Sequence, residues 1–462
     1  PKGRRAYWRC CSMLLELPSA LTVHALAMAP VPTLARLASV SRAMAEELIP
    51  LAAAARAEML GKPLPPRLSG ESALLALAFL EHAARANAQT VAAGADHSLV
   101  VGASFKVLAC GCATVGHGLP EAVEGPGLPS GGMEALSGPR PLTALSAARI
   151  LSVSCGGSHS LALDDVGAVW TWSHSHDLLG TGHGSSLPQR LAGLSSIRVI
   201  QISCGMSHSL CLSMRGVYSW GKNAKLLGRG SSASASQAAA ARPQLVEDLA
   251  GIRVMQVAAG HHSSLALAKS GDLYSWGVNS YGQLGVGDVI LRLAPTRVEF
   301  HSSIHIVHAA IAEHALALSL DGRLFGWGRN DVGQLCMSSA GGACRVPSQA
   351  PPVMLDPGGP LLQLKAVSVG LKTSALLSVC GRVFLCGAWM HRGPGSWFSI
   401  PSLLAPTKGL RITEIALGHR HAIAKGAHGE FYSIGPECER HTPECGACGD
   451  AGFTFLSTSS SE

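Results

Sequence analysis

The sequence predicts a mainly β fold: a seven-bladed β-propeller of four-stranded blades, preceded by a small α-helical N-terminal region. One pattern recurs seven times along the chain, which indicates a repeat architecture. Successive copies begin about fifty residues apart, a length that suits one four-stranded blade. Apolar and polar residues alternate with a period of two inside each copy, which favours strands over stacked helices.

Residues 257–287 show the pattern most clearly, as VAAGHHSSLALAKSGDLYSWGVNSYGQLGVG. An alternating strand ends in Gly, and a His-Ser or small pair follows. Leu-Ala-Leu, a turn and an aromatic strand ending in Trp-Gly complete the copy. The seven copies are anchored at Gly94, Gly156, Gly205, Gly260, Ile311, Gly370 and Gly418, so the fifth copy has lost its Gly.

Two residue types of the repeat are expected to serve structure rather than chemistry. A His recurs at the same turn of five copies, which favours a structural hydrogen bond in each blade over a metal or catalytic ring. These are His97, His159, His208, His314 and His421. The Trp residues of the aromatic strands are expected to fill the core, since they are large and apolar. They are Trp172, Trp220, Trp276 and Trp327.

The differences in spacing fall in three stretches that we expect to be loops at the rim or edge of the disc. Residues 113–143 are rich in Gly and Pro, and residues 229–243 are rich in Ser and Ala. The third stretch is 337–360. The strand that closes the ring is expected either at 89–93 or near 453–456.

These motifs resemble the regulator-of-chromosome-condensation repeat family over roughly residues 90–435. The resemblance rests on the repeated G-x-x-H-S-L, W-G and G-Q-L-G elements, and it implies a seven-bladed propeller. Members of this family differ widely in function, so the fold alone does not decide one. They include an exchange factor for a small GTPase, and propellers that accompany the catalytic domain of ubiquitin ligases.

Residues 13–60 are predicted to be helical, because Ala, Leu, Glu and Arg dominate them. They contain Leu17-Pro18, Pro32-Thr33-Leu34 and Val40-Ser41-Arg42 in this order. With these residues the segment resembles an F-box, which would dock on a ubiquitin-ligase adaptor, although Met44 stands where the usual Trp is expected. The alternative is a plain helical cap on the propeller. The candidate adaptor contacts are Leu17, Pro18, Leu34 and Val40. A further helix is expected at about 71–86.

The predicted organisation therefore has five parts. Residues 1–12 form a basic tail, 13–60 the F-box-like segment, and 61–88 a linker and helix. Residues 89–456 form the propeller, and 457–462 a disordered tail.

One cluster has the spacing of a metal site, because four thiolate or imidazole groups can enclose tetrahedral zinc. It consists of Cys438, His441, Cys445 and Cys448. The alternative is a Cys-bearing loop after the last repeat strand. No phosphate-binding loop and no nucleophile elbow is present, so neither catalysis nor a cofactor has support.

Composition narrows the class of partner. The net charge is only +7, and no long Lys/Arg run occurs, so direct binding to nucleic acid is not expected. No apolar run is long enough to span a membrane. No secretory signal is evident, and the fourteen cysteines lie mostly in apolar runs. We therefore expect a monomer in the cytoplasm or nucleus. The chain begins with Pro1, which is compatible with a fragment.

The sequence thus favours a protein-interaction scaffold over an enzyme. The more specific hypothesis is a substrate receptor of a cullin-type ubiquitin ligase, which would use the F-box-like segment. The alternative is a guanine-nucleotide exchange factor for a small GTPase, for which residues 113–143 are the one candidate loop.

Overall fold

The computed structural model describes the chain in segments, which are residues 23, 26–40, 44–60, 65, 68, 71–85, 89–102, 104–112, 135–173, 176–230, 236–300, 304–337, 341–353, 361–388, 397–404, 409–434 and 453–456. Two compact units are distinguished. The first comprises residues 1–87 together with 195–200, and the second comprises residues 88–194 and 201–462.

The first unit is mainly helical in its described residues. It contains α3 (Val31–Val40), the π-helical turn η1 (Met44–Leu48), α4 (Ile49–Met59) and α5 (Ala73–Arg85). Pro32 and Pro50 stand in the first turns of α3 and α4, where a missing N–H costs no helical hydrogen bond. The helix predicted at 71–86 is present as α5. Arg198 donates to Glu71 in a buried ion pair of this unit, with Nη2 2.7 Å from Oε2.

A small apolar core holds the helices together. Leu34 and Leu37 of α3 pack with Ile49 and Ala52 of α4 and with Leu77 of α5. The Arg56 side chain donates to the carbonyl oxygens of Ala27 and Ala29, before α3.

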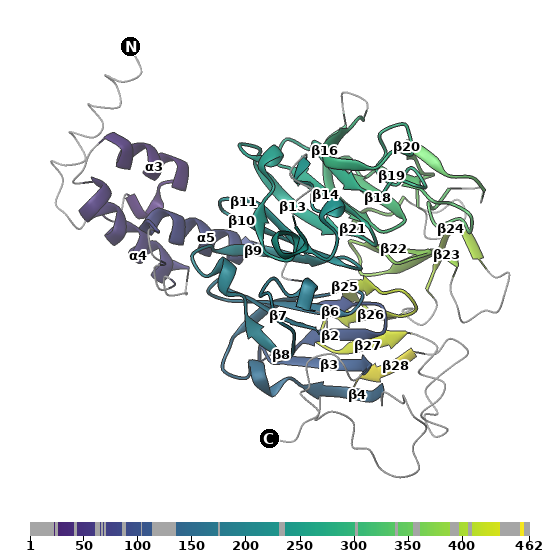
Figure 1. Cartoon of the computed structure of the whole chain (residues 1–462), viewed down its shortest axis with the longest axis horizontal. Helices are drawn as coiled ribbons and strands as arrows, with labels where there is room; N and C mark the ends of the chain where they lie inside the picture. Colours follow the sequence, from purple (N-terminus) through teal and green to yellow (C-terminus); the bar gives the residue numbers. More distant parts are fainter. Residues whose placement is uncertain are drawn as a thin grey trace, which may run out of the picture. The chain divides into compact units, whose positions relative to one another are not determined.

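The second unit is a seven-bladed β-propeller (Figure 1). In the part of the chain that the structure describes, the strands form seven antiparallel sheets of four strands each, paired in sequence order. Blades 1 to 4 consist of β1 (Val91–Ala93), β2 (His97–Val101), β3 (Val107–Cys112) and β4 (Ala135–Pro141); β5 (Ile150–Cys155), β6 (His159–Asp164), β7 (Val169–Ser173) and β8 (Ser185–Arg190); β9 (Val199–Cys204), β10 (His208–Ser213), β11 (Gly216–Gly221) and β12 (Gln244–Leu245); and β13 (Val254–Ala259), β14 (Ser263–Ala268), β15 (Leu273–Gly277) and β16 (Arg292–Val298).

Blades 5 to 7 repeat the plan. They consist of β17 (Ile306–Ile311), β18 (His314–Ser319), β19 (Leu324–Gly328) and β20 (Cys344–Gln349); β21 (Leu364–Val369), β22 (Thr373–Ser378), β23 (Val383–Ala388) and β24 (Trp397–Leu403); and β25 (Ile412–Leu417), β26 (Ala422–Gly426), β27 (Phe431–Ile434) and β28 (Phe453–Leu456). Each predicted repeat copy therefore corresponds to one blade.

Both segments proposed for ring closure are strands, but no blade combines the two ends of the chain. Residues 91–93 form the first strand of blade 1, and residues 453–456 form the last strand of blade 7. The ring closes instead by contact between these two blades. The backbone N–H of Thr90 donates to Glu414 Oε2 at 2.8 Å, and Lys425 Nζ donates to Thr90 Oγ1 at 2.9 Å.

The three stretches expected to be loops were predicted too broadly. Their described parts contain β4 at 135–141, the short helix α6 (Gln237–Ala240) and β20 at 344–349. The last strand of a blade borders solvent on one edge, so it tolerates residues that resemble a loop in composition. Five of these strands carry a proline where their pairing with the third strand shifts in register, a position at which proline is tolerated: Pro139, Pro188, Pro295, Pro347 and Pro401.

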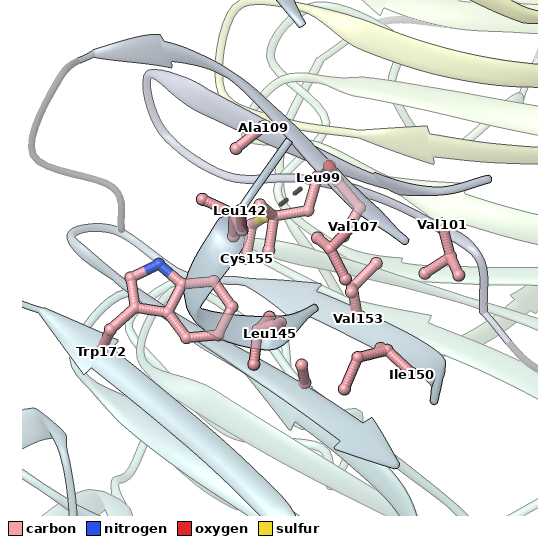
Figure 2. Close-up of a cluster of buried hydrophobic side chains, with 12 residues drawn as sticks. Leu99, Val101, Val107, Ala109, Leu142, Leu145, Ile150, Val153, Cys155 and Trp172 are labelled. Atoms are coloured by element: carbon pink, nitrogen blue, oxygen red, sulfur yellow. Dashed lines mark hydrogen bonds between the residues drawn. The ribbon is translucent and has the colours of Figure 1, made fainter. Parts of the chain in front are cut away.

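Apolar side chains fill the space between neighbouring blades. Leu99 and Val107 of blade 1 lie in one buried cluster with Val153 and Trp172 of blade 2 (Figure 2). In the described segments, no helix is long and apolar enough to cross a membrane.

The anchor glycines allow the blades to approach closely near the centre of the ring. A Cβ added at Gly156 would lie 2.5 Å from the carbonyl oxygen of Gly205 in the next blade. A Cβ at Gly260 would lie 2.7 Å from the carbonyl oxygen of Ile311. Both distances are far below van der Waals contact, and the obstructing atoms belong to the backbone, which cannot turn aside.

We expect Gly260→Ala to lower the free energy of unfolding by about 2 kcal/mol, because blades 4 and 5 must move apart. Urea denaturation of the purified chain measures this loss. Gly193→Ala is the matched control, since its Cβ would lie 3.5 Å from Pro243 and should change stability little. Equal stability of the two variants would contradict the proposed steric role.

Candidate functional site

Histidine–serine pairs join neighbouring blades around the ring. The His lies at the start of the second strand of one blade. It contacts a Ser of the next blade, which directly follows the equivalent His position there. The Nε2–Oγ distances are 2.9 Å for His97–Ser160, 2.9 Å for His159–Ser209, 2.9 Å for His208–Ser264, 2.7 Å for His314–Ser374 and 2.6 Å for His421–Ser98. The sequence predicted a hydrogen bond in each blade, but it did not predict that these bonds link different blades.

The two junctions without a histidine lack the serine as well. Between blades 4 and 5, Ser263 stands at the His position and Ala315 at the Ser position. Between blades 6 and 7, Thr373 and Ala422 replace the same two residues. Ser263 and Thr373 donate to the backbone carbonyl oxygens of Ala312 and Ala388 instead. Each pair is therefore kept or lost as a unit, so no junction leaves a buried hydroxyl unmatched.

Burial holds the paired histidines neutral. It lowers the pKa of His97, His208 and His314 to about 3, and that of His159 and His421 to about 4. At the fifth junction the Ser374 hydroxyl donates to the Gln334 carbonyl oxygen at 2.6 Å. Its proton is thus used, so Nε2 of His314 donates to Ser374.

The repeat tryptophans are fully buried and also contact the preceding blade. The indole N–H of Trp220 donates to the Leu178 carbonyl oxygen at 3.1 Å, and Trp276 donates to Leu226 at 3.1 Å. Trp327 donates to Gln283 at 2.9 Å.

The turns between the first and second strands of all seven blades form a ring, here called the turn face. It comprises residues 95–96, 157–158, 206–207, 261–262, 312–313, 371–372 and 419–420. Backbone hydrogen bonds join adjacent turns, including Met206 N to Gly260 O at 3.2 Å and His419 N to Gly94 O at 3.1 Å. Bonds of this kind join the turns of blades 7, 1, 2, 3 and 4 into one surface.

The framework of this surface repeats, but its outward residues differ. The residue before the His position changes in charge and size from blade to blade: Asp96, Ser158, Ser207, His262, Glu313, Lys372 and Arg420. These side chains are exposed or half-buried. The ring thus presents a different chemical group at almost every blade on a common backbone.

Three histidines lie together within the turn face. The ring centroids of His261 and His419 are 5.4 Å apart, and those of His261 and His262 are 4.2 Å apart. His261 belongs to blade 4 and His419 to blade 7, so their contact spans the centre of the ring. Burial lowers the pKa of all three, and the charge of Glu313 opposes this shift. No group of three or more potential metal ligands occurs in the residues that the structure describes.

Arg329 contacts two carboxylates and an aromatic ring. It forms ion pairs with Glu313 at 2.5 Å and with Asp331 at 2.7 Å. Its guanidinium carbon lies 4.9 Å from the ring centroid of Tyr281. These two carboxylates raise the pKa of Arg329, which keeps it charged throughout the ordinary pH range.

The other candidate residues from the sequence are only partly described. The zinc candidates Cys438, His441, Cys445 and Cys448 lie outside the described residues, as do Leu17 and Pro18. Leu34 is buried in the helical core, where it packs against other helices. Val40 ends α3, but its side chain is not described. The role of these residues in partner binding stays a prediction.

Sequence analysis did not single out His261, Glu313, Lys372, His419 or Arg420. The signal was present, since aligning the seven copies shows two variable positions between two constant ones. These positions share no residue type, so they do not form a recurring motif.

Comparison with known proteins places the fold in a family. A family model described as the RCC1-like domain matches residues 125–451, more than half of the chain. The chain belongs to the RCC1-like domain family. This RCC1-like chain is 31% identical over 299 residues to the ultraviolet-B receptor UVR8 of Arabidopsis thaliana, covering 62% of the chain and 65% of the receptor. It is 30% identical over 366 residues to the E3 ubiquitin-protein ligase HERC2 of Homo sapiens, covering 77% of the chain and 6% of the ligase.

Solved structures agree on the fold. The RCC1-like propeller matches the crystal structure of human WBSCR16 with a TM-score of 0.61 and 26% identity, covering 71% of this chain and 88% of that one. Prp20p of Saccharomyces cerevisiae matches with a TM-score of 0.61 and 22% identity, covering 73% of this chain and 81% of that one. The chain spans less than two thirds of the length of the receptor and a small part of the ligase. These proteins differ in activity, so the shared propeller does not decide one.

We expect the RCC1-like domain to lose stability as the pH falls below about 6.5. Below this pH the histidines bind protons in the unfolded chain but stay neutral in the folded chain. The free energy of unfolding therefore falls by about 1.4 kcal/mol per histidine per pH unit. The loss begins near the unfolded pKa and continues towards the folded values of about 3 to 4. Urea midpoints measured between pH 7.5 and 5 give this slope.

A matched variant isolates one pair. His208→Thr with Ser264→Ala installs the combination that the chain already uses between blades 6 and 7. It should fold and show a shallower pH dependence, whereas His208→Thr alone should be less stable by about 1 kcal/mol than the double variant, because Ser264 loses its partner. An unchanged slope in the double variant would show that His208 does not contribute to acid sensitivity.

Proposed function

We propose that this chain is a protein-interaction scaffold whose propeller binds a partner protein through the turn face. The observation that carries this proposal is the contrast between constant and variable positions of the repeat. The residues that hold the blades together recur, whereas the outward residues between them differ from blade to blade. A rigid surface with varied charge suits the recognition of one particular protein surface.

The charges of the turn face are unevenly placed. Lys372 and Arg420 come from neighbouring blades 6 and 7 and are exposed. The carboxylates of Glu313 and Asp331, in contrast, pair with Arg329. The partner surface opposite blades 6 and 7 is therefore expected to carry acidic groups.

We further propose that the helical unit docks on a ubiquitin-ligase adaptor, so that the chain acts as a substrate receptor. Its F-box-like sequence supports this, as does an apolar stripe on α4. Leu51 is 56% exposed and Met59 is 50% exposed, and with Ala55 between them they follow a spacing of four residues. Residues four apart share one helix face, so this stripe lies beside the face that packs in the helical core.

HERC2 is named as an E3 ubiquitin-protein ligase, and this relationship is consistent with a place in protein ubiquitination. Such a role sets an expectation of a cytoplasmic or nuclear monomer. Exchange of guanine nucleotide on a small GTPase is the competing function. Residues 113–134 of the loop considered for it lie outside the described residues, and 135–141 form β4.

We expect Lys372→Glu with Arg420→Glu to weaken partner binding at least about tenfold, since both side chains would repel acidic groups. The thermal midpoint should stay unchanged because both residues are exposed. Affinity capture identifies the partner, and titration then measures its dissociation constant. Lys269→Glu is the control, because the turn between β14 and β15 lies at the opposite end of its blade. Equal affinity of the double variant and this control would exclude the turn face.

Adaptor docking is tested separately on α4. Leu51→Arg with Met59→Arg should abolish recovery of adaptor and cullin subunits while the propeller partner is still recovered. Leu320→Arg is the control, since Leu320 is 73% exposed on the propeller. Recovery of a nucleotide-free GTPase instead, with faster release of labelled GDP from it, would replace the ligase hypothesis with exchange activity.

A further inference from the structure

A glycine–tryptophan contact recurs between consecutive blades. The glycine ends the stretch after the aromatic strand of one blade, and it lies against the indole of the next blade. The pairs are Gly180–Trp220, Gly228–Trp276 and Gly285–Trp327. A Cβ on these glycines would lie 3.2, 2.8 and 2.7 Å from the indole nitrogen, and their φ values are +76°, +69° and +72°. Both the contact and the backbone thus require glycine here.

Between blades 5 and 6, both members of this contact are cysteines. Cys336 follows Gln334-Leu335 as Gly285 follows Gln283-Leu284, and it keeps the glycine-like φ of +61°. Cys386 pairs with Ser374 across the strands, at the place where Trp276 pairs with Ser264. A side chain at the glycine position points at the tryptophan position, so the two thiols are directed at each other.

The two cysteines lie in the same cluster of the core. Both are fully buried. The Cys336 thiol donates to the carbonyl oxygen of Gln334 at 3.9 Å. Burial, with Cys336 as a neighbouring group, raises the pKa of Cys386 well above its usual value. The cysteines come from different blades, since Cys336 precedes β20 and Cys386 lies in β23.

Filling of space does not account for this arrangement. The loss of an indole could be offset by a larger apolar residue at position 386, with glycine retained at position 336. Cys336 instead adopts a left-handed conformation that is unfavourable for a residue with a Cβ. In the described residues, only Phe105 and Cys336 have a positive φ without being glycine. A strained residue that faces a second thiol indicates a chemical use for both sulfur atoms.

We propose that Cys336 and Cys386 form a reversible disulfide that cross-links blades 5 and 6. The oxidant is a small-molecule disulfide such as oxidised glutathione. One protein thiolate attacks it, forms a mixed disulfide and releases one small thiol. The second protein thiolate then attacks the mixed disulfide, so that the Sγ–Sγ bond forms and the second small thiol leaves. Two electrons pass to the oxidant, which with the two protons of the cysteines yields two small thiols.

Burial sets the conditions of this exchange. Thiolates are the reactive species, so buried thiols react when the junction opens transiently or while the chain folds. Once formed, the bond is shielded from small reductants in the closed ring. It would reinforce a junction that already carries the His314–Ser374 pair.

The test is to incubate the full chain with oxidised or reduced glutathione and then to alkylate free thiols in denaturant. Digestion and mass spectrometry should find a peptide pair linked through Cys336 and Cys386, lighter by two hydrogen atoms, which reduction separates. The oxidised chain should also show a higher thermal midpoint than the reduced chain. If the chain stays folded during incubation with oxidised glutathione and both cysteines are nevertheless alkylated afterwards, the proposal is wrong.

A matched variant keeps the test independent of folding. Cys336→Gly with Cys386→Trp rebuilds the glycine–tryptophan contact of the preceding junctions, so it is expected to fold. Its thermal midpoint should not respond to glutathione. If oxidation raises the midpoint of this variant as much as that of the native chain, other cysteines cause the effect and the proposal fails.

Discussion

The hydrogen bond between a buried histidine and a serine of the next blade is the interaction on which the ring depends. A blade has two apolar faces, and packing alone would allow neighbouring blades to slide, because apolar contacts have little directionality. The His–Ser bonds fix the height of one blade against the next at five of the seven junctions. They stand directly beside the anchor glycines, where the backbones approach most closely. The height of a blade and its distance from the next blade are thus fixed at the same point. The adjacent turns are held in place as a result.

The repeat tolerates change when both sides of a junction change together. The Ser263–Ala315 and Thr373–Ala422 junctions lack the histidine and its partner hydroxyl. Ser263 donates to a carbonyl oxygen of the next blade, whereas Thr373 donates to Ala388 within its own blade. Cys336 and Cys386 likewise replace both members of a glycine–tryptophan contact. The physical reason is the cost of a buried polar group or a void, which falls on whichever partner remains. The unit that varies in this protein is therefore the junction between blades and not the blade.

Much of the fold could be predicted from the sequence, because a blade is specified by local patterns. Period-two alternation, the Leu-Ala-Leu strands and the Trp-Gly ends predicted seven sheets in their correct positions. The last strands, such as β4 and β20, were missed because their exposed edges tolerate Pro, Gly and Ser. The His–Ser pairs could not be predicted as pairs, since residues such as His421 and Ser98 meet only when the ring closes. The turn face could not be predicted for a similar reason, because its members lie far apart in sequence and share no residue type.

Every blade draws its four strands from one uninterrupted stretch of chain, including the blade that ends with β28. The junction between blades 7 and 1 therefore differs from the other six in its covalent structure only because no peptide link crosses it in the described residues. The propeller is a circle whose starting point is arbitrary in energetic terms. Joining the ends of the propeller by a linker and opening the backbone between two other blades would give a permuted chain with the same seven junctions and the same turn face.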